Sequence, residues 1–363
     1  MKIGIPREIK DKEYRVAITP SGVQALTSRG HEVIIETNAG VDSTFMNEDY
    51  EEVGAQILAT AQEVFDQADM ILKVKEPQQS ECKMLREGQI IFTYLHLAAD
   101  RELTKALMDS KCTAIAYETI QGMNGSLPLL TPMSEIAGRM SVQIGAQYLE
   151  KRNGGRGVLL GGVSGVPSAN VVIIGAGVTG TQAAKVALGM GAFVTILDRN
   201  IDRLRYLDDI LEGRFETVAS DIGSISRSVA FADLLVGSVL IPGAKTPTLV
   251  TEDMVKTMRE GSVIVDISVD QGGCVETIHP TSHSEPIYVK HGVIHYGVTN
   301  MPGAVPRTST YALTNATLPY VLELAEKGYE RAINENHLLS YGLNIDKGEI
   351  IYGVVAEAFP DLV

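Results

Sequence analysis

The sequence has few cysteines, no long apolar run and no cluster of basic residues, and each absence excludes a class of protein. Cys82, Cys112 and Cys274 are widely separated and show no C-x-x-C spacing, so neither a disulfide framework nor a zinc site is expected. Free thiols favour a reducing, cytoplasmic location, although an odd cysteine can also be a reactive thiol. Gly, Pro or charge interrupts every apolar stretch before it reaches the roughly 18 residues of a membrane span.

The charge of the chain narrows the choice of partners. The formal net charge is −14 at pH 7, so nucleic acid or an acidic membrane surface would be repelled. The N-terminal segment MKIGIPREIK leads directly into a strand-like stretch and lacks the apolar core of a secretory signal. Hydrophobic residues at 45% and charged residues at 21% describe a soluble globular protein. A chain of 363 residues is too long for one ordinary core, so two domains are expected.

The most informative stretch is Asn170–Gly180, where a run of β-branched residues ends in G-x-G-x-x-G. The next segment, Thr181–Met190, has the composition of a helix. Strand, glycine turn and helix in this order are typical of a dinucleotide site, although the turn can also occur without a ligand. Gly175 would permit the tight turn, Gly177 would let the backbone approach a pyrophosphate, and Gly180 would let the helix pack closely on the sheet.

An acidic residue follows at the position where a dinucleotide site needs one. The apolar run Ala192–Leu197 is closed by Asp198, and a carboxylate there would bind the adenosine ribose hydroxyls. Its charge would repel a 2′-phosphate, so NAD is favoured over NADP, although the nearby Arg199 and Arg203 weaken this inference.

Strands and helices alternate on both sides of this stretch, which predicts parallel sheets covered by helices. In the first part, strands are predicted at 3–5, 31–36, 70–74, 89–94 and 112–117, and helices at 20–30, 61–68 and 101–110. The helix after Thr19 should be capped by that residue and begin with Pro20. This part has no glycine fingerprint and is expected to be a substrate domain.

The rest of the chain, from about residue 131 onward, predicts that a nucleotide domain is inserted into the substrate domain. A helix over 132–152 should connect the domains, strands at 234–236, 262–267 and 292–298 should complete a six-stranded sheet, and a helical tail over 310–334 should pack on the first domain. Pro319 marks a possible kink in that tail. The expected fold is α/β, with two Rossmann-like doubly wound domains and a cleft between them. The expected boundaries are 1–130 plus 307–363 for the substrate domain and 131–306 for the NAD-binding domain.

Four polar residues stand where chemistry is expected. Lys75 and His96 come just after strands, Arg15 lies in the loop before the first helix, and Asp270 follows a strand of the nucleotide domain. Ligands of parallel sheets bind at the carboxyl ends of strands. Closing the cleft could bring the four together.

Hydride transfer on a small amino or oxo acid would use this set. Arg15 and Lys75 would hold the carboxylate, His96 would hydrogen-bond the carbonyl or amine and move a proton, and Asp270 would act as general base on water or ammonium.

Each residue also has an ordinary structural explanation. A loop arginine is usually solvated, a histidine in an apolar run is often a satisfied core group, a lysine can end a strand, and Asp270 before Gln-Gly-Gly can form a turn.

Five segments together resemble the alanine dehydrogenase/pyridine nucleotide transhydrogenase family, in order along nearly the whole chain: KIGIPREIKDKEYRVAITP, LKVKEP, YLHLA, GAGVTG and DISVDQGG. The resemblance is strongest to the NAD-dependent alanine dehydrogenases. It implies that Arg15 and Lys75 bind the substrate carboxylate, that His96 and Asp270 are the catalytic pair, and that Asp198 binds the adenosine ribose. It also implies NAD contacts from Ser134, Val178, Thr179, Arg203, Ser220, Val239, Leu240, Ile267, Val298, Thr299, Asn300 and Met301.

The resemblance also implies a homohexamer. Some relatives place a magnesium ion near the residue equivalent to Glu323 and a histidine four positions on. Lys327 occupies that second position here, so no metal is expected.

The expected reaction is the reversible, NAD-dependent deamination of L-alanine to pyruvate and ammonium. A nucleotide-binding part of a proton-translocating transhydrogenase is the nearest rival, although it would need membrane spans or a partner subunit. A saccharopine-type dehydrogenase with a bulkier substrate is a second enzyme alternative. A catalytically silent NAD-binding sensor or scaffold is the alternative from another class, but four polar candidates at strand ends argue against it.

Overall fold

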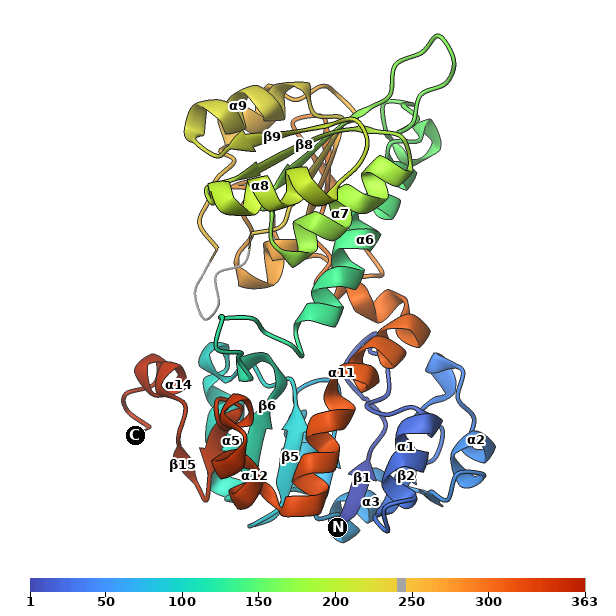
Figure 1. The fold of residues 1–363 in the computed structure, drawn as a ribbon, viewed down its shortest axis with the longest axis vertical. Helices are drawn as coiled ribbons and strands as arrows, with labels where there is room; N and C mark the ends of the chain where they lie inside the picture. Colours follow the sequence, from blue (N-terminus) through green and yellow to red (C-terminus); the bar gives the residue numbers. More distant parts are fainter. Residues whose placement is uncertain (240–245, 363) are drawn as a thin grey trace. The chain divides into compact units, whose positions relative to one another are not determined.

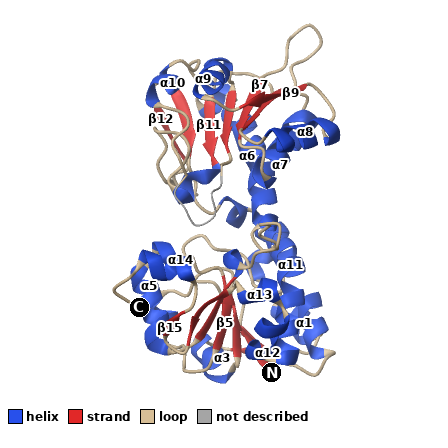
Figure 2. Ribbon diagram, turned by 60° about the vertical axis from the view of Figure 1, so that its left-hand side comes forward, coloured by secondary structure: helices blue, strands red, loops and turns tan. Residues whose placement is uncertain are grey.

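A computed structural model describes residues 1–239 and 246–362. The chain divides into two compact units, one made of Met1–Met133 with Gly303–Val363 and the other of Ser134–Pro302. Each unit contains one sheet dominated by parallel strands, with helices packed on its faces (Figures 1 and 2). The predicted α/β fold, with one Rossmann-like unit inserted in another, is confirmed. No helix in the described ranges is both long and apolar enough to cross a membrane.

The first sheet has the strand order β15-β14-β6-β5-β4-β1-β2-β3. Its parallel strands are β1 (Lys2–Ile5), β2 (Glu32–Glu36), β3 (Gln56–Leu58), β4 (Met70–Leu72), β5 (Ile90–Thr93) and β6 (Thr113–Ala116). The chain builds β1, β2 and β3 toward one edge and then returns to build β4, β5 and β6 on the other side of β1. This reversal between β1 and β4 is a topological switch point, where open α/β sheets bind ligands at the carboxyl ends of strands.

Helices cover this sheet on both faces. The helices of the unit are α1 (Pro20–Thr27), α2 (Asn47–Glu51), α3 (Ala61–Gln67), α4 (Gln79–Cys82), α5 (Arg101–Ser110), α11 (Pro306–Lys327), α12 (Tyr329–Glu335), α13 (His337–Ser340) and α14 (Gly353–Ala358). The Thr19 side chain accepts the Gly22 N–H at 3.3 Å and Pro20 is the first residue of α1, so the predicted cap is confirmed.

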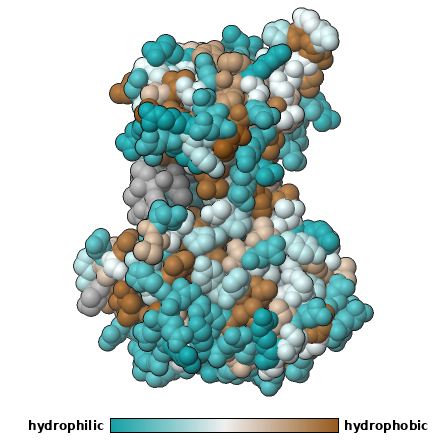
Figure 3. All heavy atoms as spheres, in the orientation of Figure 1, coloured by the Kyte–Doolittle hydropathy of each residue, from teal (hydrophilic) through white to brown (hydrophobic). Residues whose placement is uncertain are grey.

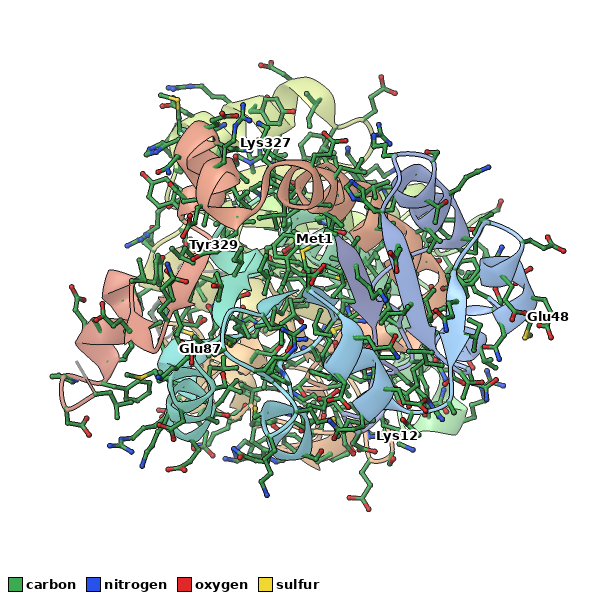
Figure 4. All side chains as sticks on the ribbon, turned by 90° about the horizontal axis from the view of Figure 1, so that it is seen from below. Met1, Lys12, Glu48, Glu87, Lys327 and Tyr329 are labelled. Atoms are coloured by element: carbon green, nitrogen blue, oxygen red, sulfur yellow. The ribbon has the colours of Figure 1, made fainter. Side chains whose placement is uncertain are left out.

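The long tail helix differs from the prediction in where it ends. α11 continues through Pro319 and ends at Lys327. The next residue, Gly328, has a φ of 74°, a backbone conformation that glycine adopts readily. Lys327 and Tyr329, labelled in Figure 4, flank this break between α11 and α12. The predicted helical stretch 310–334 is therefore divided between α11 and α12 at Gly328, and the helix is not ended by Pro319.

The tail also contributes two strands that the sequence did not predict. β14 (Leu343–Asp346) pairs antiparallel with β6, and β15 (Glu349–Ile350) pairs antiparallel with β14. Lys347 and Gly348 join them with φ angles of 52° and 91°, which is the geometry of a two-residue hairpin turn.

The second sheet has the order β12-β13-β11-β10-β7-β8-β9. Its strands are β7 (Asn170–Ile174), β8 (Phe193–Asp198), β9 (Phe215–Ala219), β10 (Leu234–Gly237), β11 (Val263–Asp266), β12 (Ile287–Lys290) and β13 (Val293–Tyr296). The prediction of six strands accounts for the parallel set, and β12 adds an antiparallel strand at one edge. The chain reverses between β7 and β10, so this sheet repeats the switch point of the first.

Alternate residues of each strand divide the core of the second unit into two layers. Val171 and Ile173 pack in the cluster that contains residues of α6 (Thr131–Tyr148), α7 (Val178–Gly189) and α8 (Ile201–Ile210). Val172 and Ile174 face the cluster that contains residues of α9 (Ile222–Phe231) and α10 (Glu252–Lys256). Because side chains alternate across a strand, an unbroken apolar run is buried on both faces.

A projecting loop precedes β7. It is closed by an antiparallel bridge between Val163 and Val166, and the side chains of Leu159, Val163 and Val166 are exposed (Figure 3, upper right).

Candidate functional site

The glycine turn after β7 has the geometry that its sequence predicts. Gly175 adopts a φ of 103°, which favours glycine. A Cβ added to Gly180 would lie 1.8 Å from the Gly175 carbonyl oxygen, whereas a Cβ on Gly177 would meet no atom within 4 Å. Gly177 caps α7, which begins at Val178 and therefore three residues earlier than predicted. Open space in front of a glycine at a helix N-terminus fits a pyrophosphate group.

Asp198 ends β8 beside this turn. Its Oδ2 accepts the Ala176 N–H at 2.7 Å and its Oδ1 accepts the Asn200 N–H at 2.8 Å. Arg203 lies over the same turn, because its Nε donates to the Ala176 carbonyl at 2.7 Å and its Nη2 donates to Thr181 at 2.8 Å. The predicted ribose acid and the nearby arginine therefore both lie at the glycine turn.

The other predicted cofactor residues follow the carboxyl ends of neighbouring strands. These residues are Ser220 after β9, Val239 after β10, Ile267 after β11, and Val298, Thr299, Asn300 and Met301 after β13, and the predicted catalytic residue Asp270 also follows β11. Leu240 lies outside the described residues. Parallel strands end at one edge of the sheet, so these segments line the same edge as Gly175 and Asp198.

Ser134 joins this set from α6. Gly138 packs so closely on the first turn of α7 that a Cβ there would lie 2.2 Å from the Thr179 carbonyl oxygen. Ser134 lies one turn before Gly138 on the same face of α6, and Val178 and Thr179 open α7. α6 thus brings Ser134 toward the N-terminus of α7.

Asp270 sits in a loop that a buried carboxylate closes. The loop is η5 (Ile267–Gln271), a short 3-10 helix directly after β11. Asp266 accepts the N–H groups of Ser268 at 2.9 Å, Cys274 at 2.7 Å and Val275 at 3.1 Å. Burial raises the pKa of Asp266, and these backbone donors oppose that rise. The loop that carries the predicted base is thereby tied to the end of β11.

Arg15 is fully buried and is held by its neighbour Glu13. Nε and Nη2 of Arg15 each donate to Glu13 at 2.6 Å, and Nη1 donates to Met133 Sδ at 3.0 Å. Burial alone would lower the pKa of Arg15. The charge and the hydrogen bonds of the adjacent Glu13 carboxylate oppose this effect, and the pKa of Arg15 is raised overall. A thioether is a weak acceptor, so a substrate carboxylate would be a stronger partner for Nη1.

Lys75 is a half-buried cation that lies near two other cations, Arg15 and Lys10. Within the described residues, its side chain has no hydrogen bond or ion pair, although its backbone N–H donates to Glu8 at 3.4 Å. Burial, Arg15 and Lys10 lower the pKa of Lys75, and Glu76 and Glu13 oppose this shift without cancelling it. Such an ammonium group favours the arrival of an anion, which would pair with it and offset the repulsion.

His96 follows β5 in a left-handed conformation with φ 53° and ψ 38°, which is uncommon for a residue other than glycine. Glu118 supports this conformation, because its carboxylate accepts the N–H of Leu95 at 3.2 Å and of His96 at 2.6 Å. The Glu118 Oε1 also lies 3.9 Å from Nδ1 of His96. The Tyr94 ring stacks near the imidazole at 6.1 Å between centroids. The imidazole is about half exposed and is accessible to a small molecule.

The structure brings three of the four predicted polar residues to one place. Arg15, Lys75 and His96 follow β1, β4 and β5, which are adjacent parallel strands at the switch point of the first sheet. Asp270 occupies the equivalent edge of the second sheet.

Sequence reasoning missed the carboxylates that support these residues. Glu118 follows β6, so the rule that singled out Lys75 and His96 would also have found it. Glu13 and Asp266 carry no such signal, because their roles depend on which donors the fold places beside them.

The described residues include no group of three or more potential metal ligands among His, Cys, Asp and Glu. Lys327 forms ion pairs with Glu323 at 2.8 Å and Glu335 at 2.9 Å.

Comparison with known proteins identifies the family. Residues 4–137 match the alanine dehydrogenase/PNT N-terminal domain, and residues 141–353 match the alanine dehydrogenase/PNT C-terminal domain. The chain belongs to the alanine dehydrogenase/PNT family. The family predicted from the sequence is thus confirmed.

Relatives within this family cover nearly the whole chain. An alanine dehydrogenase of Methanococcus maripaludis is 62% identical over 359 residues, which are 99% of this chain and 96% of that protein. A solved structure titled L-alanine dehydrogenase is 53% identical, covers both chains completely and has a TM-score of 0.97. A transhydrogenase structure from Sinorhizobium meliloti is 25% identical, covers 97% of this chain and 99% of that chain, and has a TM-score of 0.82.

Proposed function

We propose that this alanine dehydrogenase/PNT family member catalyses L-alanine + NAD⁺ + H₂O ⇌ pyruvate + NH₄⁺ + NADH + H⁺. The observation that carries the proposal is the half-buried Lys75 ammonium, which lies near Arg15 at a switch point and forms no ion pair with any described residue, although Glu76 and Glu13 act on it from further away. A small carboxylic acid supplies the charge that this position lacks. The 62% identity to an alanine dehydrogenase, against 25% to a transhydrogenase, supports the same reaction.

The first unit would bind the substrate by its carboxylate. Arg15 would offer one or both prongs of its guanidinium and Lys75 a compact charge. The tight pairing of Arg15 with Glu13 keeps the guanidinium in a fixed orientation, which lowers the entropy lost when the substrate binds.

The second unit would bind NAD at the glycine turn. The residues fit the cofactor, because the space in front of Gly177 is open and the Asp198 carboxylate lies beside the same turn, where it accepts the Ala176 N–H. Asp198 would accept the ribose hydroxyls and repel a 2′-phosphate, which favours NAD over NADP. When bound, NAD⁺ supplies the acceptor for the hydride that leaves the substrate α-carbon.

His96 and Asp270 would handle the protons. The His96 imidazole could donate a hydrogen bond to the substrate carbonyl in amination and take a proton from the amine in deamination. Asp270 would take a proton from the water that attacks the imine carbon, so that ammonia leaves and pyruvate forms. One NAD⁺ is reduced to NADH for each ammonium released, as the overall equation requires.

One set of assays separates this proposal from its rivals. Oxidation of NADH is measured with pyruvate and ammonium, with 2-oxoglutarate and lysine, and with an oxidised nucleotide analogue in the absence of an oxo acid. Turnover only in the first mixture supports alanine dehydrogenase activity. Turnover in the second or third would instead identify a saccharopine-type dehydrogenase or a transhydrogenase, and no turnover in any mixture would favour a silent NAD-binding protein.

We also propose a homohexamer in the cytoplasm, with only small molecules as further partners. Family resemblance supports the hexamer, and the three buried free thiols support a reducing compartment. Light scattering of the purified chain tests the oligomeric state, and a mass far from six chains would reject it.

A further inference from the structure

Three charged side chains are buried together beneath the loop that carries Lys75. The Lys73 ammonium lies 3.0 Å from Glu8 Oε2 and 2.8 Å from Glu81 Oε1. All three side chains are at most 3% exposed. Glu8 comes from the loop after β1, whereas Lys73 and Glu81 flank the loop after β4. This buried triad therefore joins the two loops that hold Arg15 and Lys75.

The triad contains two carboxylates but only one ammonium group, so one negative charge is not neutralised. A buried charge without full compensation costs free energy. Burial raises the pKa of Glu8, with Lys73 opposing the rise and Glu13 and Glu81 adding to it. A neutral side chain at position 8 would leave Lys73 and Glu81 as a balanced pair. Stability alone therefore does not explain why a carboxylate is present at position 8.

The second oxygen of Glu8 contacts the backbone of the Lys75 loop. Glu8 Oε1 accepts the Val74 N–H at 2.5 Å and the Lys75 N–H at 3.4 Å. On the other side of Lys75, the Glu76 carboxylate forms an ion pair with Lys10 from the same loop as Glu8. The backbone of Lys75 is thus fixed from both sides by the loop that leads to Arg15.

We infer that Glu8 is a positioning residue for substrate binding, because its carboxylate fixes the backbone from which the Lys75 ammonium reaches the substrate carboxylate. The inference rests on the proposed function, since it needs Lys75 to bind the carboxylate of pyruvate or alanine. Glu8 itself acts through Lys75 and does not touch the substrate.

Glu8→Gln tests the inference, with Glu81→Gln as the matched control. Both oxygens of Glu8 accept donors, and so do both oxygens of Glu81, which binds Lys73 and the Gln78 N–H at 2.7 Å. A glutamine has only one acceptor oxygen, so each variant loses one bond and one negative charge. Glu81 makes no contact with the backbone of Val74 or Lys75 within the described residues, so only Glu8→Gln is able to disturb that backbone.

The measurements are KM for pyruvate, kcat, Kd for NADH and the melting temperature of the full-length chain. In Glu8→Gln we expect KM for pyruvate to rise roughly tenfold or more, as small misplacements of binding groups do. The Kd for NADH and the melting temperature should stay near wild type, and Glu81→Gln should keep its KM. A purely structural role would lower the melting temperature and kcat but leave KM unchanged, and this result would overturn the inference.

Two further arrangements keep the test decisive. If Glu8→Gln does not fold, Glu8→Asp is measured instead, since it keeps the charge but withdraws the oxygen from Val74, and the same outcomes apply.

If the wild-type chain shows no turnover with pyruvate and ammonium, the proposed function fails. Calorimetric titration of pyruvate into wild-type and Glu8→Gln protein then tests the Glu8 inference separately. Equal pyruvate affinity in the two proteins would reject it.

Discussion

Gly180 packs so closely on Gly175 that a Cβ on Gly180 would lie 1.8 Å from the Gly175 carbonyl oxygen. Gly177, between them, has open space where its Cβ would point. One G-x-G-x-x-G turn therefore contains one glycine that the fold requires and another that only a ligand would require.

This difference predicts opposite effects of two small substitutions. Gly180→Ala should lower the free energy of unfolding by about 1–3 kcal/mol, the usual cost of forcing an extra carbon into a packed region. Gly177→Ala should keep wild-type stability but weaken NADH binding at least roughly tenfold, because its methyl group would occupy the pyrophosphate position. Chemical denaturation and NADH fluorescence titration measure the two effects. Unchanged NADH affinity in Gly177→Ala would mean that no pyrophosphate lies there.

The pH dependence of pyruvate binding should report the charge on Lys75. Burial and the nearby Arg15 and Lys10 lower the pKa of Lys75, so its positive charge is present at low pH and is lost as pH rises through that lowered pKa. Lys10→Gln removes a neighbouring positive charge and should raise the pKa of Lys75. The alkaline loss of pyruvate affinity, measured by calorimetry in the presence of NADH, should then move to higher pH.

Lys12→Gln is the control for this experiment. Lys12, labelled in Figure 4, is half-buried in the same loop and forms no ion pair with any described residue, so its removal should leave the pH profile in place. An equal shift in both variants would indicate a general charge effect instead of one at Lys75.

Removal of the His96 imidazole should separate catalysis from cofactor binding. His96→Ala should lower kcat by roughly 10²–10⁴-fold, the range for loss of a general acid–base group, and should leave the Kd for NADH nearly unchanged. His291→Ala is the control, since His291 pairs with Glu252 in the second unit and has no assigned role. Substantial residual turnover in His96→Ala would remove the proton-transfer role.

Asp198 should determine the choice between NAD and NADP. Asp198→Ala should weaken NAD binding roughly tenfold or more, because hydrogen bonds to a charged acceptor contribute about 1.5–3 kcal/mol, and discrimination against NADP should relax. Asp202→Ala serves as the control, because Asp202 is exposed and pairs with Arg205. If Asp198→Ala retains the wild-type preference for NAD, another residue reads the ribose.

Local patterns in the sequence were enough to predict much of this architecture. Thr19 before Pro20 predicted a helix start, apolar runs such as 171–174 predicted buried strands, and the glycine fingerprint predicted the turn after β7. Such features depend on residues close together in the chain. The strands β14 and β15 were missed because they are short, because β14 is stabilised by pairing with β6, more than 200 residues away, and because β15 pairs in turn with β14.

Backbone preferences and side-chain periodicity act locally, so the residues alone predict the alternation of strands and helices, the glycine turn and the polar residues at strand ends. The partners of those residues follow from the folded chain: Glu13 for Arg15, Glu118 for the backbone of His96, and Arg15 and Lys10 near Lys75. These relationships depend on strand order and burial, which bring distant segments together and remove water from between their charges. The buried Glu8–Lys73–Glu81 triad is of the same kind, since nothing in its separate segments shows that two of its carboxylates share one ammonium.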